Sequence, residues 1–250
     1  MASRLRRLAA WLAATVLVAV VVVFALLLYP QPLYAYSAAE GRLTIHSDRA
    51  FDAVKARGLL AEVERRLAAA PAELRDADSR YHIVVANHQW RRRLAFLWNH
   101  GAGGVNYYPI AWNAFIRQAD IDAGVVLRSD GTPVPAPRTL AYYAAHEIGH
   151  SLIGRRYGAL ANWSLPVWIR EGLADYVGFG GEVDIEALAA AMRRGDPDLD
   201  PHRSGLYARY RLLVAFMLER EGWSVDRLLQ SNTPIAEAEG LLAARLWPEG

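Results

Sequence analysis

The chain of 250 residues contains no cysteine, and this absence removes several kinds of chemistry at once. It excludes a disulfide framework, a cysteine-ligated zinc site and a thiol nucleophile. Any metal site must therefore be built from histidine and carboxylate side chains. Internal repeats and low-complexity tracts are also missing, and 53% of the residues are hydrophobic, which excludes a disordered polar chain.

The sequence also lacks the basic excess that is typical of nucleic-acid-binding proteins. Its formal net charge is +2, and Arg4, Arg6 and Arg7 near the N-terminus account for it. Without these three residues, 25 basic residues stand against 26 acidic ones. We therefore expect no nucleic acid among the partners of this protein.

Residues 8–29 form a run of 22 residues without a charge, rich in Val, Leu and Ala. A helix of this length spans roughly 33 Å, which is enough to cross the core of a bilayer. Because the three arginines precede the run, the positive-inside rule predicts that residues 1–7 are cytoplasmic and the rest is extracytoplasmic. We expect a single-pass signal anchor in the cell membrane. The alternative is a cleaved signal peptide and a secreted protein, although the run is long for one.

The remainder of the chain predicts one α+β domain. Pro30 and Pro32 end the apolar helix, and we expect residues 30–41 to be a linker. Residues 42–137 mix strand and helix patterns, whereas residues 138–250 have the periodicity of successive helices. The domain over residues 42–250 is therefore expected to have a mixed α/β lobe followed by a helical lobe, with the active site where they meet.

The strongest motif is His146-Glu147-Ile148-Gly149-His150. On a helix, the two histidines lie one turn apart on the same face, so both imidazoles can reach one cation at about 2.0–2.1 Å. Glu147 lies beside them, where a carboxylate can take a proton from a metal-activated water. The alternative is a helix that carries two incidental histidines.

A second predicted helix, over residues 165–177, carries Glu171 and Asp175 four residues apart and therefore on one face. Glu171 would supply the third protein ligand of a catalytic zinc ion and leave the fourth position for water. Asp175 is expected to accept the outer N–H of a ligating imidazole, that of His146. The alternative is a solvated acidic pair, but this helix is largely apolar, and ionised residues on a buried face need partners.

Together the two segments resemble the gluzincin zinc metallopeptidases, in which an HExxH helix is followed by a helix with a ligating glutamate and an aspartate four residues later. The resemblance covers about residues 138–222 and is closest to the aminopeptidase-like and thermolysin-like branch and its small membrane-anchored relatives. It implies a zincin-like fold, one zinc ion bound by His146, His150 and Glu171, and Glu147 as the general base.

The resemblance extends more weakly to a helix that begins near Tyr207, where the aminopeptidase-like branch has a tyrosine that donates to the oxyanion. Tyr207 matches that position, and Tyr210, one turn later, is the rival. A neutral phenol aimed at developing negative charge would stabilise the transition state more than the ground state. The alternative is that both tyrosines are packing residues.

The resemblance also implies a substrate-aligning strand just before the HExxH helix, to which substrate would add as a further strand. Our candidate residues for this strand are Ala123, Gly124, Val125 and Val126. The amine-binding glutamate of the aminopeptidases has no counterpart in the glycine-rich segment 103–106, which puts amine-directed exopeptidase activity in doubt.

The sequence thus predicts a membrane-anchored zinc metallopeptidase that hydrolyses peptide bonds of a protein or peptide substrate through a metal-activated water. Two alternatives stay open. One is a non-catalytic, membrane-tethered protein that binds a partner on a zincin-like fold. The other is a zinc hydrolase that acts on non-peptide amides or esters.

Overall fold

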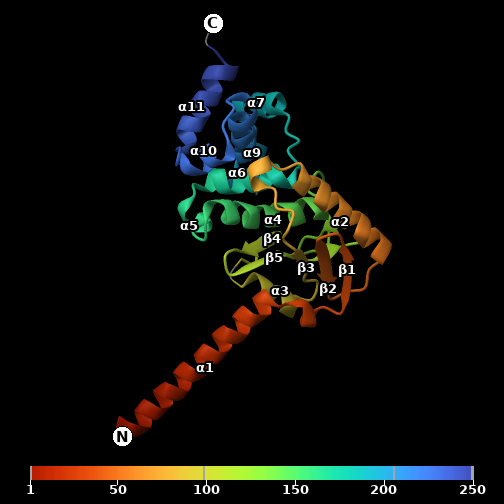
Figure 1. Cartoon of the computed structure of the whole chain (residues 1–250), viewed down its shortest axis with the longest axis vertical. Coiled ribbons are helices and arrows are strands. Elements are labelled where there is room, and N and C mark those ends of the chain that lie inside the picture. The colour runs from red at the N-terminus through yellow and green to blue at the C-terminus, as the bar shows by residue number, and fades with distance from the viewer. Residues whose placement is uncertain (1, 98, 205, 249–250) are drawn as a thin grey trace.

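The computed structural model describes residues 2–97, 99–204 and 206–248. Residue 1 of the basic N-terminal segment and residues 249–250 of the helical lobe lie outside the described residues. The fold is mixed α/β: one long helix leads into a sheet, and further helices stack in layers on that sheet (Figure 1). The expected mixed α/β composition is confirmed, and among the described residues all named strands come before α4 (Leu140–Tyr157) and helices alone follow it.

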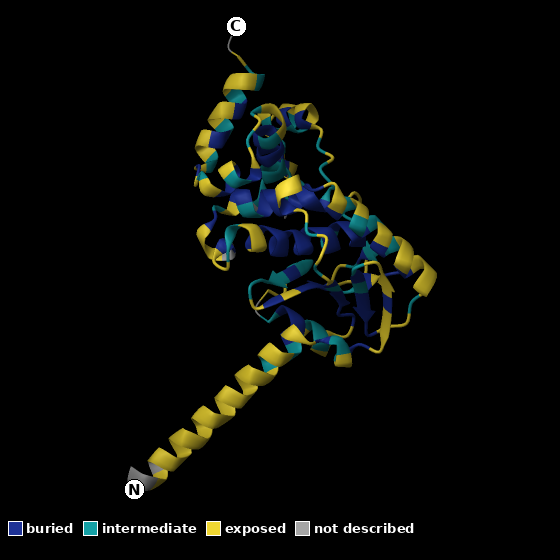
Figure 2. Cartoon of the chain, in the orientation of Figure 1, coloured by how far each residue is buried: buried dark blue, intermediate teal, exposed yellow. Residues whose placement is uncertain are grey.

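Helix α1 (Ala2–Leu28) is apolar enough to span a membrane or to be a signal sequence. The candidate membrane span covers Arg6–Leu28, and most of its surface is exposed (Figure 2). Its last turn, by contrast, is joined to the domain. Leu27 is buried, and the side-chain amide of Asn113 donates to the carbonyl oxygens of Leu27 and Leu28, at 2.7 and 3.3 Å.

The central sheet has five strands, in the order β1 (Tyr36–Glu40), β2 (Leu43–Ser47), β3 (Tyr81–Val85), β5 (Ala111–Ile116) and β4 (Gly104–Tyr107). The three inner strands run parallel, and each edge strand is antiparallel to its neighbour. Inner strands are buried on both faces, which explains their dense apolar side chains. Strand β4 therefore forms one edge of the sheet, and it is the edge beside the candidate site.

The expected linker over residues 30–41 is folded. Residues Gln31–Leu33 form a 3-10 turn, Tyr34 is buried, and β1 pairs with β2 in register from Tyr36–Ser47 to Glu40–Leu43. Of the five residues of β1 only Ala38 is buried. An edge strand with one small inward side chain has little apolar alternation, which is why the sequence pattern did not reveal it.

Each face of the sheet is covered by helices. Helices α2 (Ala53–Ala68) and α4 (Leu140–Tyr157) lie on one face and share its main hydrophobic core. Helix α3 (Gln89–Phe96) and the end of α1 contribute to a smaller apolar cluster on the other face. The sheet is thus enclosed on both sides, and α4 lies directly above β4 and β5 (Figure 1).

Above α4, helices α6 (Val167–Gly178) and α9 (Ala208–Ala215) form the next layers. Two glycines permit this stacking. A Cβ on Gly149 would lie 3.3 Å from the Ala174 Cα, and one on Gly172 only 2.5 Å from the Tyr210 carbonyl oxygen. The other elements are short or peripheral: β6 (Ala119–Asp120), β7 (Val125–Val126), α5 (Ala161–Ser164), α7 (Ile185–Arg193), α8 (Pro201–Ser204), α10 (Val225–Gln230) and α11 (Ile235–Leu246).

Asp76 ties the C-terminal end of α4 to the sheet. Its Oδ2 accepts a hydrogen bond from the Tyr81 hydroxyl at 2.7 Å and pairs with Arg155 Nη1 at 2.7 Å. Partial burial alone would raise the pKa of Asp76, but hydrogen bonds from Tyr81 and Ser79 and the charge of Arg155 lower it from 3.8 to about 2. Asp76 is therefore ionised, and stabilising, at neutral pH.

We predict that Asp76→Asn lowers the free energy of unfolding at pH 7 by about 1 to 2 kcal/mol. Since the folded-state pKa lies below the unfolded one, the carboxylate stabilises the fold above about pH 4 and loses its effect as the pH falls toward 2. Thermal unfolding of the full chain in detergent at pH 7 and at pH 2 measures this. The exposed Asp78→Asn is the control, and an equal deficit of Asp76→Asn at both pH values would contradict the prediction.

Candidate metal centre

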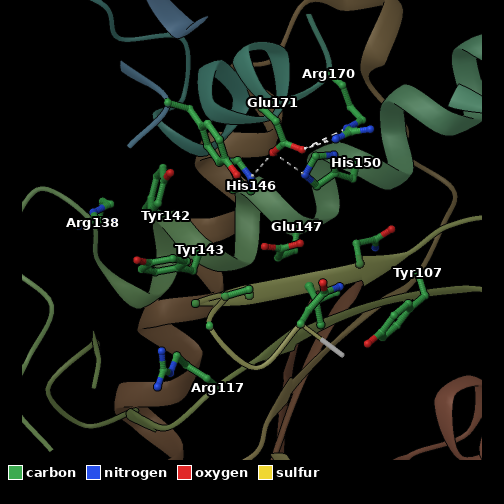
Figure 3. A pocket seen from close by; sticks show the side chains of 18 of the residues that line it. Tyr107, Arg117, Arg138, Tyr142, Tyr143, His146, Glu147, His150, Arg170 and Glu171 are labelled. Carbon is green, nitrogen blue, oxygen red and sulfur yellow. Dashed lines mark hydrogen bonds and ion pairs between the residues drawn. The ribbon is translucent and has the colours of Figure 1, made fainter. Parts of the chain in front are cut away.

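Helix α4 presents His146, Glu147 and His150 toward one cavity (Figure 3). The helix begins after Thr139, whose hydroxyl accepts a hydrogen bond from the Tyr142 amide at 3.2 Å. The four-residue spacing brings the two imidazole rings within 5.0 Å of each other, centroid to centroid. All three side chains are buried, in a helix whose inner positions carry small and apolar residues.

Glu171 completes the group from the neighbouring helix α6. Its Oε2 lies 3.7 Å from the Nε2 of His146 and 3.5 Å from the Nε2 of His150. Two ligands of a tetrahedral ion, each held at 2.0–2.1 Å, lie about 3.3 Å apart, so these separations are close to those of a ligand set. The three ligand atoms lie within 4.8 Å of one another, and this group can bind a metal ion.

The second oxygen of the Glu171 carboxylate has its own partner. Oε1 accepts from Arg170, with the Nε and one terminal nitrogen of the guanidinium each at 3.0 Å. Burial alone would raise the pKa of Glu171, but His150 and His146 hold it well below its usual value. Glu171 is therefore an anion at neutral pH, with Oε2 directed at the two imidazoles and Oε1 at the arginine.

The imidazole of His146 is in an unusually acidic environment. Its burial would lower the pKa, but the carboxylates of Asp175, Glu171 and Glu147 raise it from 6.5 to about 10. Three carboxylates around one buried imidazole concentrate negative charge that a cation can neutralise. A divalent metal ion would supply that positive charge without requiring a protonated histidine.

Asp175 stands behind His146 but does not hydrogen-bond to it in this structure. Its Oδ1 is 3.7 Å from the Nδ1 of His146, and that buried nitrogen lacks a hydrogen-bond partner among the described residues. Tyr142 donates to Oδ1 of Asp175, and Arg211 donates to Oδ2 at 2.7 Å. The sequence analysis missed Tyr142 and Arg211, because neither belongs to a short motif with the ligands.

The cavity in front of the group has a volume of about 840 Å³ and is lined by α4, α6, Tyr207 and strand β4. Glu147 faces β4 so closely that a Cβ on Gly104 would lie 2.4 Å from its Oε1. Burial and the nearby Glu171 raise the pKa of Glu147, and the two histidines oppose them, with the net shift upward. A carboxylate of raised pKa beside the group formed by His146, His150 and Glu171 is suited to accepting a proton.

Of the two tyrosine candidates, Tyr207 lines the cavity and Tyr210 packs behind it. The ring of Tyr207 is stacked on that of His146, with the centroids 5.8 Å apart and the planes 8° from parallel. Burial, and then the charges of Glu171 and Glu147, raise the pKa of Tyr207. Its phenol is therefore a neutral hydrogen-bond donor at physiological pH.

The candidate substrate strand Ala123, Gly124, Val125 and Val126 does not line this cavity. Val125 and Val126 form β7, which pairs only with the two-residue strand β6 within the described sheets, and the Gly124 carbonyl accepts from the Leu140 amide. Residues 103–108, which contain β4, line the cavity in their place. The strand next before α4 in sequence is therefore not the strand next to it at the site.

We predict that the purified full chain carries about one divalent ion, and that the donor set favours zinc. Glu171→Gln removes the only anionic ligand and should reduce the metal content at least tenfold, whereas Glu237→Gln, exposed on α11, should not. Elemental analysis measures both. Stripping the ion with a chelator should lower the Tm, because bound metal stabilises the folded state alone. Full metal content in Glu171→Gln would contradict the assignment of this ligand.

We also predict that Tyr142→Phe weakens metal binding about 10- to 100-fold, since it frees one oxygen of the carboxylate behind His146. Tyr176→Phe is the matched control, because it removes a hydroxyl that donates to Glu219 at 2.9 Å, away from the metal group. Competition with a chromophoric chelator measures the affinities. Equal affinity of Tyr142→Phe and the unmodified chain would show that Asp175 needs no such support.

The group formed by His146, His150 and Glu171 is thus a candidate metal centre, with Glu147 and Tyr207 beside it in an open cavity. The group offers nitrogen and oxygen donors and no sulfur. Compared with family models, with curated proteins and with solved structures, the chain matches none.

Proposed function

We propose that this protein is a zinc-dependent metallopeptidase of the gluzincin type, held at a membrane by its N-terminal helix. One observation carries the proposal: a carboxylate oxygen from α6 lies 3.7 and 3.5 Å from two imidazole nitrogens of α4. Two histidines and one glutamate leave the fourth position of a tetrahedral zinc ion open, which distinguishes a catalytic site from a structural one. A bound zinc ion would supply an activated water and polarise the scissile carbonyl.

Glu147 is the proposed general base. It accepts a proton from the attacking water and delivers that proton to the leaving amine. Its raised pKa, caused first by burial, lets the carboxyl hold the proton between these two steps. Gly104 supports this role, since the absence of a side chain there leaves room for the Glu147 carboxylate between α4 and β4.

Tyr207 is the proposed donor to the oxyanion. Tyr207 lines the cavity, and its phenol is kept protonated by burial and by the nearby carboxylates of Glu171 and Glu147. A neutral donor that meets negative charge only in the transition state lowers the barrier without tightening substrate binding. Tyr210, whose ring centroid is 5.9 Å from that of Tyr207, supports the position of Tyr207 rather than contacting substrate.

A peptide substrate would lie along β4. Among the described strands β4 is at the edge of the sheet and pairs with β5, so a peptide strand could be added along its other side. The Asn106 amide donates to the Ser151 hydroxyl of α4 at 2.9 Å, which fixes the distance between the strand and the metal helix. An extended chain on β4 would pass directly beneath Glu147.

The proposed location is the extracytoplasmic side of the cell membrane, with residues 1–7 in the cytoplasm. Arg4, Arg6 and Arg7 precede the apolar segment and favour this orientation. The buried Leu27 and the Asn113 hydrogen bonds favour a retained anchor over a cleaved signal, because cleavage would uncover the apolar cluster that Leu27 helps to fill.

We predict that Glu147→Gln reduces peptide hydrolysis by the full chain at least 100-fold while the metal content stays near one ion per chain. The purified protein in detergent is incubated with casein and with a peptide library, and the products are identified by mass spectrometry. Glu237→Gln, which makes the same chemical change on an exposed surface, should cleave like the unmodified chain.

The same experiment separates the alternatives. A metal-loaded chain that leaves every peptide intact but hydrolyses amide or ester reporters in a Glu147-dependent manner would make it a non-peptide hydrolase. No hydrolysis of any substrate with metal bound would favour a partner-binding protein and overturn the proposed activity.

A further inference from the structure

The cavity is lined by more positively charged side chains than negatively charged ones, and the negative ones lie at or beside the candidate metal centre. Among the described residues two carboxylates line the cavity: Glu171 belongs to the candidate metal centre, and Glu147 lies beside that centre. Four guanidinium groups face it as well: Arg117, Arg128, Arg138 and Arg170. A bound divalent cation would add to this positive charge, so the cavity attracts anionic groups.

Two of these arginines, Arg117 and Arg138, are partly buried and have no ion-pair partner within the part of the chain that the structure describes. Arg170 pairs with Glu171, and Arg128 is exposed. The Nε of Arg117 is buried and has no hydrogen-bond partner there. A buried donor without an acceptor destabilises the fold, and an incoming anion would satisfy it.

Arg117 and Arg138 flank the same side chain, Tyr143. In Figure 3, Tyr143 lies between the two guanidinium groups at one end of the cavity, and Arg170 and His150 are at the other end. Burial raises the pKa of Tyr143, so the phenol is protonated at neutral pH, and the charges of Arg138 and Arg117 act against that rise. The phenol and the two guanidinium groups thus form a cluster of hydrogen-bond donors.

This cluster is one helical turn from the proposed general base. Tyr143 and Glu147 are four residues apart on α4, a rise of about 6 Å. Successive residues at the start of β4 face these two side chains. A Cβ on Gly103 would contact Tyr143, and one on Gly104 would contact Glu147. The Arg117 amide donates to the Gly103 carbonyl at 3.0 Å, so Arg117 is next to the strand position that faces Tyr143.

We propose that Arg117 and Arg138, with the Tyr143 hydroxyl, bind a carboxylate of the substrate within one or two residues of the scissile bond. The inference rests on the proposed peptidase activity for the identity of the ligand. Peptides carry carboxylates as acidic side chains and as the C-terminus, and the planar guanidinium group binds either in a bidentate manner. The substrate class is therefore an acidic peptide or a peptide cut near its C-terminal end.

The test uses one neutral peptide that the protein cleaves, in three forms: with a C-terminal amide, with a free C-terminus, and amidated with glutamate beside the scissile bond. We expect at least one of the two anionic forms to have a kcat/KM about tenfold or more above that of the neutral form. Which form gains tells whether the subsite takes a C-terminal carboxylate or an acidic side chain.

Arg138→Gln and Arg117→Gln should each remove most of this preference, measured within each variant as the ratio of kcat/KM for the anionic peptide to kcat/KM for the neutral one. Arg57→Gln, which removes an exposed charge on α2, should keep the preference. Equal kcat/KM for all three peptides in the unmodified chain, or a preference that survives in Arg117→Gln and Arg138→Gln alike, would overturn the subsite and leave the peptidase assignment standing.

A binding measurement keeps the two proposals apart. The same peptides are titrated into metal-loaded Glu147→Gln protein by calorimetry, and the anionic forms should bind about tenfold more tightly than the neutral one. Charge-selective binding without turnover by the unmodified chain would retain the subsite and reject the peptidase. Failure of all three peptides to bind, or equal affinity for them, would reject the subsite.

Discussion

The Glu171 carboxylate faces the imidazoles of His146 and His150 in a buried volume, and the packing of the helical layers keeps it there. Ionised groups are costly to bury unless they are paired, so the arrangement lasts only if α4 and α6 stay within a narrow separation. Gly149 and Gly172 allow α6 to fit between α4 and α9 at that separation. A side chain larger than hydrogen at Gly172 would push α6 away from α9. The Glu171 carboxylate would then move relative to the imidazoles, although no ligand residue had been replaced.

The cavity divides its polar groups by position. The carboxylates gather at the metal group, where Asp175, held by Tyr142 and Arg211, adds a further negative charge behind His146. Arg117 and Arg138, which have no carboxylate partner among the described residues, lie around Tyr143, one helical turn away. On the proposed function, such a separation of charge would give a bound peptide a direction, since one end would meet donors and the scissile bond would meet Glu147.

The ligand group was predictable because its information is local. The four-residue spacing on one helix and the Glu171 and Asp175 pair on a second, largely apolar helix specify facing side chains once both helices form. The proximity of β4 was not predictable, because strand order depends on pairing between distant segments. Residues 103–107 reach Glu147 through β5, whereas residues 123–126, nearer in sequence, pair elsewhere. The role of Tyr142 was hidden for a related reason, as its partner Asp175 is 33 residues away.

The last turn of α1 belongs to the same packed body as the sheet, through Leu27 and the amide of Asn113. If the helix crosses a bilayer, no loose tether separates the lipid from the domain. The tilt of α1 would then set the height of the cavity beside β4 above the bilayer and the direction in which it opens, because the domain could rotate little relative to the helix. On the proposed function, substrate chains would then have to reach Glu147 at one height above the lipid surface, so distance from the bilayer would select substrates.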